Sequence, residues 1–182
     1  SSVEENEGKS TIASNIALAM AQSGKKVILL DMDLRRPAIY KIFDVESKSE
    51  NGFWREEFPV SGQHKMQLFL NKKAVKNPAV FIKEKKVGAL LERSKEVADI
   101  IIVDSSPMNA AADTELVLAY ADASLLVVRK DWVHTADLNR AIDILEKGDT
   151  EFLGYVLNDY EYGKALSSRK DGYNYGYGAY QK

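Results

Sequence analysis

A short run near the N-terminus, Glu7-Gly8-Lys9-Ser10-Thr11, combines the residue types that bind phosphate. Gly8 lets the backbone approach a ligand closely, Lys9 can place its ammonium against phosphate oxygens, and Ser10 can offer a hydroxyl to Mg²⁺. The apolar pattern that follows predicts a helix over 11–23. The free N–H groups and the positive dipole end of that helix would face the same anion, so the run indicates the last part of a nucleotide-binding loop.

Two aspartate-bearing segments could supply the carboxylates that an NTPase needs beside such a loop. Residues 27–30 form a short apolar run that leads into Asp31 and Asp33, and residues 100–103 form another that leads into Asp104. Runs of this kind are typical of buried parallel strands, whose carboxyl ends lie at one edge of a sheet. There the aspartates could hold Mg²⁺ with its waters and orient a nucleophile.

Neither the loop nor the aspartates are specific on their own. Val3 stands where the full loop pattern has glycine, so a plain helix start capped by Ser10 stays open. Each aspartate segment could equally be a strand followed by a polar turn. The three elements in this order, at spacings that allow adjacent parallel strands, favour a phosphoryl-transfer site over these alternatives.

The rest of the pattern alternates strands with helices, which is typical of βαβ units. Further strands are predicted over 66–70, 124–128 and 152–157, and further helices over 38–43, 81–97, 110–120 and 136–146. We therefore expect an α/β fold of the P-loop NTPase kind, a mostly parallel sheet with helices on both faces in three layers. Residues 44–64 are expected to be irregular, with at most short elements. Only residues 1–3 precede the loop, so the strand that normally leads into it is expected to be absent, and we interpret the chain as a fragment.

The composition disfavours several other classes of function. The 182 residues are enough for one domain with a sizeable core, and 25 basic against 27 acidic residues leave no electrostatic footprint for nucleic acid. The chain has no cysteine, which excludes disulfides and thiolate metal sites, and its two histidines, His64 and His134, are far apart in the sequence. No apolar run approaches the roughly 20 residues that span a bilayer, and we expect no signal peptide.

The C-terminal segment 159–182 differs in character from residues 1–158, which we predict to form the nucleotide-binding domain. It is rich in tyrosine, and within 172–180 tyrosine alternates largely with glycine. Such a segment has no periodic apolar face and is costly to order, so it cannot build a core. It is either a low-complexity adhesive tail or a flexible string of phosphate acceptors.

Together these segments resemble the cytoplasmic kinase domain of the bacterial tyrosine kinases, within the deviant-Walker P-loop ATPases. The resemblance covers nearly the whole chain, and its most specific part is an arginine-bearing motif that ordinary P-loop NTPases lack. The matching segments are 7–11 with 15–17 (Walker A), 27–37 (Walker A′), 100–107 (Walker B), Asp113 and 121–129.

The resemblance implies an ATP-dependent protein-tyrosine autokinase that phosphorylates the C-terminal tyrosines of neighbouring subunits, with ATP and Mg²⁺ as cofactors. One of two aspartates would orient the attacking tyrosine hydroxyl or take its proton. The implied catalytic residues are Lys9, Asp31, Asp33 and Arg35; the nucleotide-binding residues are Glu7, Gly8, Lys9, Ser10, Thr11 and Asn158; the Mg²⁺ ligands are Ser10 and Asp104; the phosphate acceptors are Tyr173, Tyr175, Tyr177 and Tyr180.

The resemblance also implies a cellular setting. Kinases of this kind act with a transmembrane adaptor in the synthesis or export of capsular or other extracellular polysaccharide. The chain is therefore expected to be cytoplasmic and peripheral at the inner face of the bacterial plasma membrane. Family members assemble into rings, but the arginine-containing helix that serves this assembly is absent before the loop, so a homo-oligomer stays open for this chain.

Two departures from the family pattern lie in the loop, where Glu5 and Asn6 stand in place of Pro-Gly. Asn tolerates left-handed backbone, so the loop is still expected to form. One rival is a MinD- or ParA-like ATPase switch, but those proteins carry a signature lysine where this chain has Glu4. A second rival is a degenerate, non-catalytic P-loop scaffold, which the retained lysine and aspartates disfavour.

Overall fold

The computed structural model describes residues 1–46, 53–61, 64–83, 86–110 and 113–160. Its larger sheet has four strands in the order β2-β3-β1-β4. The central strand β1 (Val27–Met32) pairs in parallel with β3 (His64–Leu70) and with β4 (Ile100–Ser105). The edge strand β2 (Trp54–Ser61) pairs antiparallel with β3. The predicted mostly parallel sheet is therefore confirmed.

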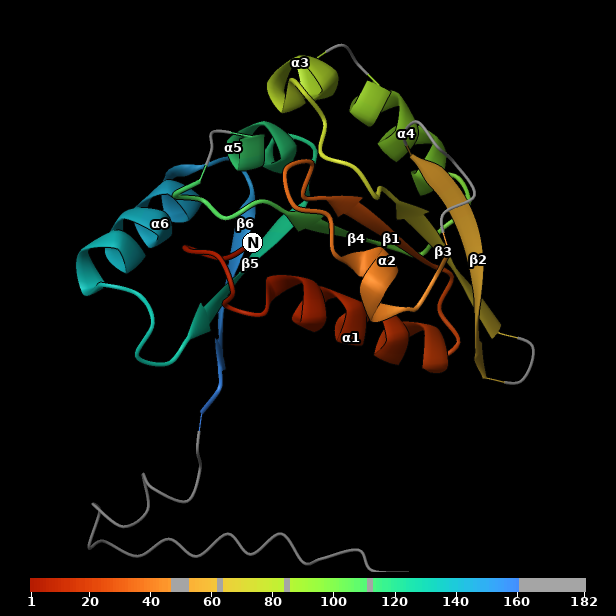
Figure 1. Cartoon of the computed structure of the whole chain (residues 1–182), viewed down its shortest axis with the longest axis horizontal. Helices are drawn as coiled ribbons and strands as arrows, with labels where there is room; N and C mark the ends of the chain where they lie inside the picture. Colours follow the sequence, from red (N-terminus) through yellow and green to blue (C-terminus); the bar gives the residue numbers. More distant parts are fainter. Residues whose placement is uncertain (47–52, 62–63, 84–85, 111–112, 161–182) are drawn as a thin grey trace, which may run out of the picture.

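Helices cover both faces of this sheet, as predicted (Figure 1). On one face lie α1 (Lys9–Gln22) and α2 (Ile39–Ile42), and on the other lie α3 (Pro78–Lys83), α4 (Lys86–Lys95) and α5 (Asp113–Leu118). Strand β1 is buried along its whole length because its alternate side chains enter two separate cores. This double burial explains the uninterrupted apolar run that predicts the strand.

The second sheet contains β5 (Ala123–Arg129) and β6 (Glu151–Asn158), which run in parallel. Helix α6 (Thr135–Lys147) connects them and packs on one face through Ala141 and Leu145. The last strand ends at Asn158, as the sequence predicts.

Residues 1–3 lie where the two sheets meet, and Figure 1 marks the N-terminus beside β5. Ser2 forms a parallel bridge with Val127, and the N–H of Val127 donates to the carbonyl of Ser1 at 2.8 Å. Val3 is fully buried. Beyond this bridge, a mostly apolar cavity of about 520 Å³ separates β4 from β5. Within the ranges described, this isolated bridge is the β-structure that precedes the loop.

Three predictions about elements need correction. The segment 44–64 is not merely irregular, because β2 occupies Trp54–Ser61 within it. Its alternation of exposed and half-buried residues is masked by charge and by Pro59, which an edge strand tolerates. The single helix predicted over 81–97 is instead two, because α3 begins at Pro78 and ends at Lys83, and α4 covers Lys86–Lys95. The helix predicted over 110–120 is shorter, since α5 begins at Asp113 and ends at Leu118.

Among the residues that the structure describes, no helix has both the length and the apolar character needed to cross a membrane.

Candidate active site

The loop before α1 has the backbone shape of a phosphate cradle. Asn6 and Gly8 both adopt left-handed conformations, with φ of 63° and 89°. Gly8 is the N-cap of α1, and a Cβ added to it would collide with the side-chain amide of Asn158. Only glycine fits this position without strain or displacement. An α-helix leaves the N–H groups of its first turn without partners inside the helix, so those of α1, which begins at Lys9, are available to an anion at this loop.

Lys9 lies at the centre of the candidate site. Its Nζ is 2.8 Å from Oδ2 of Asp33 and 4.0 Å from Oδ2 of Asp104, and it donates to the hydroxyl of Ser10 at 3.2 Å. The side chain of Ser10 is buried, whereas that of Thr11 is exposed. The structure thus brings together the predicted phosphate-binding lysine, the predicted Mg²⁺-binding serine and two of the three predicted aspartates.

Asp31 and Asp104 stand side by side at the carboxyl ends of β1 and β4, where they are register partners. Both are buried. Oδ2 of Asp31 accepts hydrogen bonds from the N–H groups of Ala38 and Ile39, each at 3.0 Å. Oδ1 of Asp31 and Oδ2 of Asp104 are buried without a hydrogen-bond partner. A buried oxygen of this kind is costly unless a cation or a proton satisfies it, and Oδ2 of Asp104 has the ammonium of Lys9 at 4.0 Å.

The electrostatics divide the three carboxylates into two kinds. Burial, followed by the charge of Asp104, raises the pKa of Asp31 to about 8. Burial also raises the pKa of Asp104, against the opposing effects of Lys9 and Ser10. For Asp33 burial is again the largest effect and works in the same direction, but the ammonium of Lys9 together with the hydrogen bonds from Arg36 and Ser106 outweighs it, and the pKa of Asp33 is lowered. At neutral pH, Asp33 is therefore the carboxylate held in its ionised form.

Lys9 responds in the complementary way. Burial disfavours its charged form, but the carboxylates of Asp104 and Asp33 outweigh that cost and raise the pKa of Lys9. The ammonium is therefore fixed in its charged state at neutral pH. This is the state needed to neutralise charge on a phosphate.

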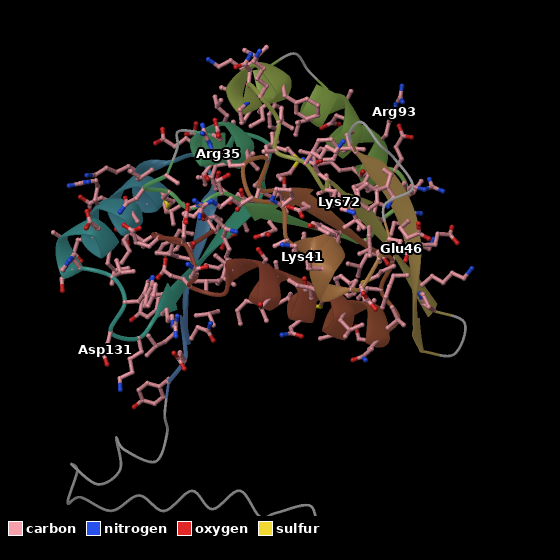
Figure 2. All side chains as sticks on the ribbon, viewed as in Figure 1. Arg35, Lys41, Glu46, Lys72, Arg93 and Asp131 are labelled. Carbon is pink, nitrogen blue, oxygen red and sulfur yellow. The ribbon has the colours of Figure 1, made fainter. Side chains whose placement is uncertain are left out.

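Arg35 is positioned by a residue to which the sequence assigned no role. Its Nε donates to Oδ2 of Asp113 at 2.7 Å, and Figure 2 shows Arg35 beside α5. Asp113 is buried in the first turn of that helix, while the side chain of Arg35 remains 48% exposed. The exposed part leaves the guanidinium free to meet an incoming group. The sequence signal for Asp113 is its match to the resembled family.

Ser106 is a second residue of the site that sequence reasoning missed. Its hydroxyl donates to Oδ1 of Asp33 at 3.1 Å, and the N–H of Arg36 donates to the same oxygen at 2.9 Å. These bonds fix the carboxylate beside Lys9. The signal for Ser106 is its place directly after β4, where side chains meet the end of β1.

The remaining predicted residues lie on either side of the loop. Glu7 is fully buried, and its carbonyl accepts a hydrogen bond from Nδ2 of Asn158 at 2.9 Å. Asn158 therefore lies against the loop at the end of β6. The predicted acceptors, Tyr173, Tyr175, Tyr177 and Tyr180, lie outside the described residues.

The residues present fit a nucleotide with Mg²⁺. Among the residues described, no group of three or more histidine, cysteine, aspartate or glutamate side chains could hold a metal ion alone. Mg²⁺ usually takes only one or two carboxylates and fills its other positions with water and phosphate oxygens. The unpartnered oxygens of Asp31 and Asp104, together with the hydroxyl of Ser10, supply such a partial donor set beside the loop.

Comparisons with known proteins agree with this geometry. A family model described as ParA, "NUBPL iron-transfer P-loop NTPase", matches residues 6–177. The chain is 29% identical over 178 residues to the tyrosine-protein kinase YwqD of Bacillus subtilis (strain 168), and the aligned region covers 94% of this chain and 72% of YwqD. It is 25% identical over 183 residues to the tyrosine-protein kinase CpsD of Streptococcus agalactiae, and the aligned region covers 96% of this chain and 79% of CpsD.

Solved structures share the fold. The kinase domain of Escherichia coli tyrosine kinase ETK superposes with a TM-score of 0.76 at 24% identity, covering 97% of this chain and 70% of that one. MinD from Pyrococcus horikoshii OT3, complexed with Mg-ADP, has a TM-score of 0.66 at 18% identity and covers 86% of this chain and 67% of that one. Since the family model covers most of its length, the chain belongs to the ParA-like family of P-loop NTPases and has relatives named tyrosine-protein kinases.

Proposed function

We propose that this chain is an ATP-dependent protein-tyrosine kinase that phosphorylates the C-terminal tyrosines of neighbouring copies. The observation that carries the proposal is the convergence of Lys9, Asp31, Asp33 and Asp104 beside a left-handed glycine loop. Phosphoryl transfer is catalysed mainly by positioning and by charge, and this cluster provides both. The names of the relatives support tyrosine as the acceptor.

The residues of the loop would bind the phosphates of ATP. The backbone N–H groups of residues 8–11 would cradle the β- and γ-phosphates, and Lys9 would neutralise the charge that develops on them. Ser10 and Asp104, with Asp31 beside them, would hold Mg²⁺, and the ion would supply positive charge to offset that of the phosphates. Asn158 is proposed to contact the nucleobase, because it lies at the edge of the loop on β6.

In the reaction, the phenolic oxygen of a tyrosine forms a bond to the γ-phosphorus while the bond from that phosphorus to the β–γ bridging oxygen breaks, releasing ADP. The phenolic proton passes to a carboxylate or to the transferred phosphate. Asp33 is ionised at neutral pH but already accepts several hydrogen bonds, so it is better suited to orient the phenol than to act as a strong base. Free tyrosine has a pKa near ~10, so orientation matters more than basicity. Arg35 would contact the transferred phosphate or the incoming chain.

The proposed acceptors are Tyr173, Tyr175, Tyr177 and Tyr180 in the segment 159–182. As the family resemblance implies, the chain would work at the inner face of a bacterial plasma membrane with a transmembrane adaptor. Tyrosine phosphorylation there would regulate the synthesis or export of capsular or other extracellular polysaccharide. Transfer between copies requires them to meet, at least transiently.

The MinD-like switch is the second candidate, since MinD shares the fold. Against it, the position of the signature lysine holds Glu4, whose carboxylate accepts a hydrogen bond from Nδ2 of Asn109 in the same chain at 2.9 Å. An acid held in this way cannot neutralise a phosphate across a dimer interface. The family description also names iron transfer, but this chain has no cysteine to carry an iron–sulfur cluster.

A mixing experiment tests the proposal. An active chain whose four acceptor tyrosines are replaced by phenylalanine is incubated with Mg·ATP and a Lys9→Ala chain that keeps them. Phosphotyrosine on the Lys9→Ala chain is the expected result. If only unmixed wild type is phosphorylated, transfer is intramolecular. If neither sample gains phosphotyrosine while calorimetry shows Mg·ATP binding, the switch is favoured, and if nothing binds, the scaffold is favoured.

A further inference from the structure

Glu7 joins the nucleotide loop to both strands of the second sheet. It is the fully buried acid of the loop, and its carboxylate accepts two backbone hydrogen bonds. Oε2 accepts from the N–H of Glu4 at 2.6 Å, and Oε1 accepts from the N–H of Arg129 in β5 at 3.0 Å. Its carbonyl accepts from the side chain of Asn158 in β6 at 2.9 Å.

We propose that Glu7 is a positioning residue whose carboxylate sets the anion-binding shape of the loop. In this role the side chain does not contact the nucleotide. It acts through residues 4–8, whose path determines where the backbone N–H groups before α1 point. The inference rests on the proposed nucleotide site and adds a specific function for a side chain that is buried beneath it.

The backbone around Glu7 shows why the loop needs such a residue. Asn6 and Gly8, its two neighbours, both have positive φ. A non-glycine residue in this region is held there only when surrounding contacts determine its conformation. The carboxylate of Glu7, which lies between these two residues in the chain, ties the loop from its buried side to the N–H groups of Glu4 and Arg129.

The end of β5 holds the outer side of the same loop. The indole Nε1 of Trp132 donates to the carbonyl of Glu5 at 3.0 Å, and the guanidinium of Arg129 stacks 4.5 Å from the centre of the Trp132 ring. The side chain of Arg129 also pairs with Asp159 at 2.9 Å. The backbone N–H of Arg129 that meets Glu7 therefore belongs to a residue that is itself fixed in place.

Only a carboxylate satisfies this arrangement. Both oxygens of an ionised glutamate accept hydrogen bonds, whereas a glutamine side chain offers one acceptor and one NH₂ donor. In Glu7→Gln the NH₂ group would face a backbone N–H, and one of the two loop contacts would be lost. The variant keeps the size of the side chain, so it tests hydrogen bonding and not packing.

The sign of the effect separates positioning from simple electrostatics. A negative charge near bound phosphates weakens their binding, so removing it should raise affinity. The positioning role predicts the reverse for Glu7. Glu4→Gln is the matched control, because it removes the same charge from the same loop while its remaining oxygen can still accept from Asn109.

The test compares Mg·ADP affinity in the full chain by calorimetry, with unfolding midpoints measured without nucleotide. We expect Glu7→Gln to bind roughly 10- to 100-fold more weakly, and Glu4→Gln to stay within about threefold of wild type or to bind more tightly. The unfolding midpoint of Glu7→Gln is expected to fall by a few degrees while the chain stays folded, because a buried N–H loses its acceptor, and that of Glu4→Gln is expected to change little. With ATP as substrate, KM should rise while kcat stays within about threefold, because the loop holds the phosphates alike in the ground and transition states.

Each outcome either supports or overturns the positioning role of Glu7. If Glu7→Gln binds Mg·ADP as wild type does, or if kcat falls while KM is unchanged, the positioning role is wrong. If Glu7→Gln does not fold, Glu7→Asp replaces it, since a shorter carboxylate keeps the charge but cannot reach both N–H groups. Weak binding by folded Glu7→Asp supports the role, and wild-type binding or a failure to fold overturns it. If wild type itself does not bind Mg·ADP, the proposed function fails together with this inference.

Discussion

The ammonium of Lys9 lies 2.8 Å from the carboxylate of Asp33, and both side chains are largely buried at the mouth of the loop. Each holds the other in its charged form, since Lys9 lowers the pKa of Asp33 and Asp33 helps to raise the pKa of Lys9. The pair is therefore ready, before ATP arrives, for a reaction in which negative charge moves between oxygens. Breaking it should affect stability as well as turnover.

Lys9→Met leaves the carboxylates of Asp33 and Asp104 buried without a cation. We expect the free energy of unfolding near pH 7 to fall by on the order of 2–4 kcal/mol. Without Lys9 the pKa of Asp33 rises in the folded state, so the folded protein binds the extra proton and the loss shrinks as the pH falls toward about 5. Denaturant unfolding at both pH values measures this, with exposed Lys25→Met as the control. An equal loss at both pH values would contradict the prediction.

Asp31→Asn is expected to stabilise the nucleotide-free protein at alkaline pH. The pKa of Asp31 is raised from 3.8 to about 8, so between these values the folded state holds a proton that the unfolded state releases. Wild-type stability should therefore fall as pH rises, by up to about 1.4 kcal/mol per pH unit, and Asp31→Asn should not share this slope. Urea unfolding with EDTA across this range provides the measurement.

Two comparisons complete that experiment. Asp149→Asn, an exposed site, should keep the wild-type slope. Added Mg²⁺ should flatten the slope of wild type but not that of Asp31→Asn, because a cation beside Asp31 favours its ionised form. Parallel wild-type and Asp31→Asn curves would show that Asp31 titrates at its ordinary pKa.

Gly8→Ala should abolish tight nucleotide binding and cost roughly 2–3 kcal/mol of stability. The added methyl meets the side chain of Asn158 at a φ of 89°, so collision and backbone strain combine. Gly154→Ala is the matched control: its φ is 111°, but nothing lies within 4 Å of the added carbon. It should show strain alone, with normal nucleotide affinity in calorimetry. Equal nucleotide affinity in the two variants would remove the steric argument for Gly8.

Arg35 and Asp113 should behave as one unit. If Asp113 positions Arg35 for transfer, Arg35→Ala and Asp113→Asn will each lower kcat by roughly tenfold, and the double variant will lose little more. Steady-state autophosphorylation rates test this, with circular dichroism to confirm that α5 persists. A faster Asp113→Asn enzyme would instead identify the 2.7 Å ion pair as a restraint on Arg35.

The sequence predicts the parts of the site that follow from strand ends. Asp31 and Asp104 are register partners because two apolar runs become adjacent parallel strands, and this follows from pattern alone. The contact between Asp33 and Ser106, and that between Arg35 and Asp113, depend on how loops fold after the strands. No local pattern encodes those contacts.

The difference between patterns within a segment and contacts between segments also explains which features the sequence failed to predict. Strand β2 was hidden because an edge strand needs only one buried face and can carry Pro59 and several charges. The role of Glu7 is hidden because an acid beside a phosphate loop suggests exposure in the sequence. Only the folded loop and the path of β5 reveal its two N–H partners, Glu4 and Arg129. Periodicity reports burial of apolar residues and does not report burial of polar ones.

The most direct test of the central claim is mass spectrometry of peptides from residues 161–182 after incubation with Mg·ATP. Wild type is expected to carry phosphate on one or more of Tyr173, Tyr175, Tyr177 and Tyr180, and EDTA or Lys9→Ala is expected to prevent it. A wild-type chain that binds Mg·ATP but gains no phosphotyrosine, or a Lys9→Ala chain that gains as much as wild type, would contradict a tyrosine kinase built on this site.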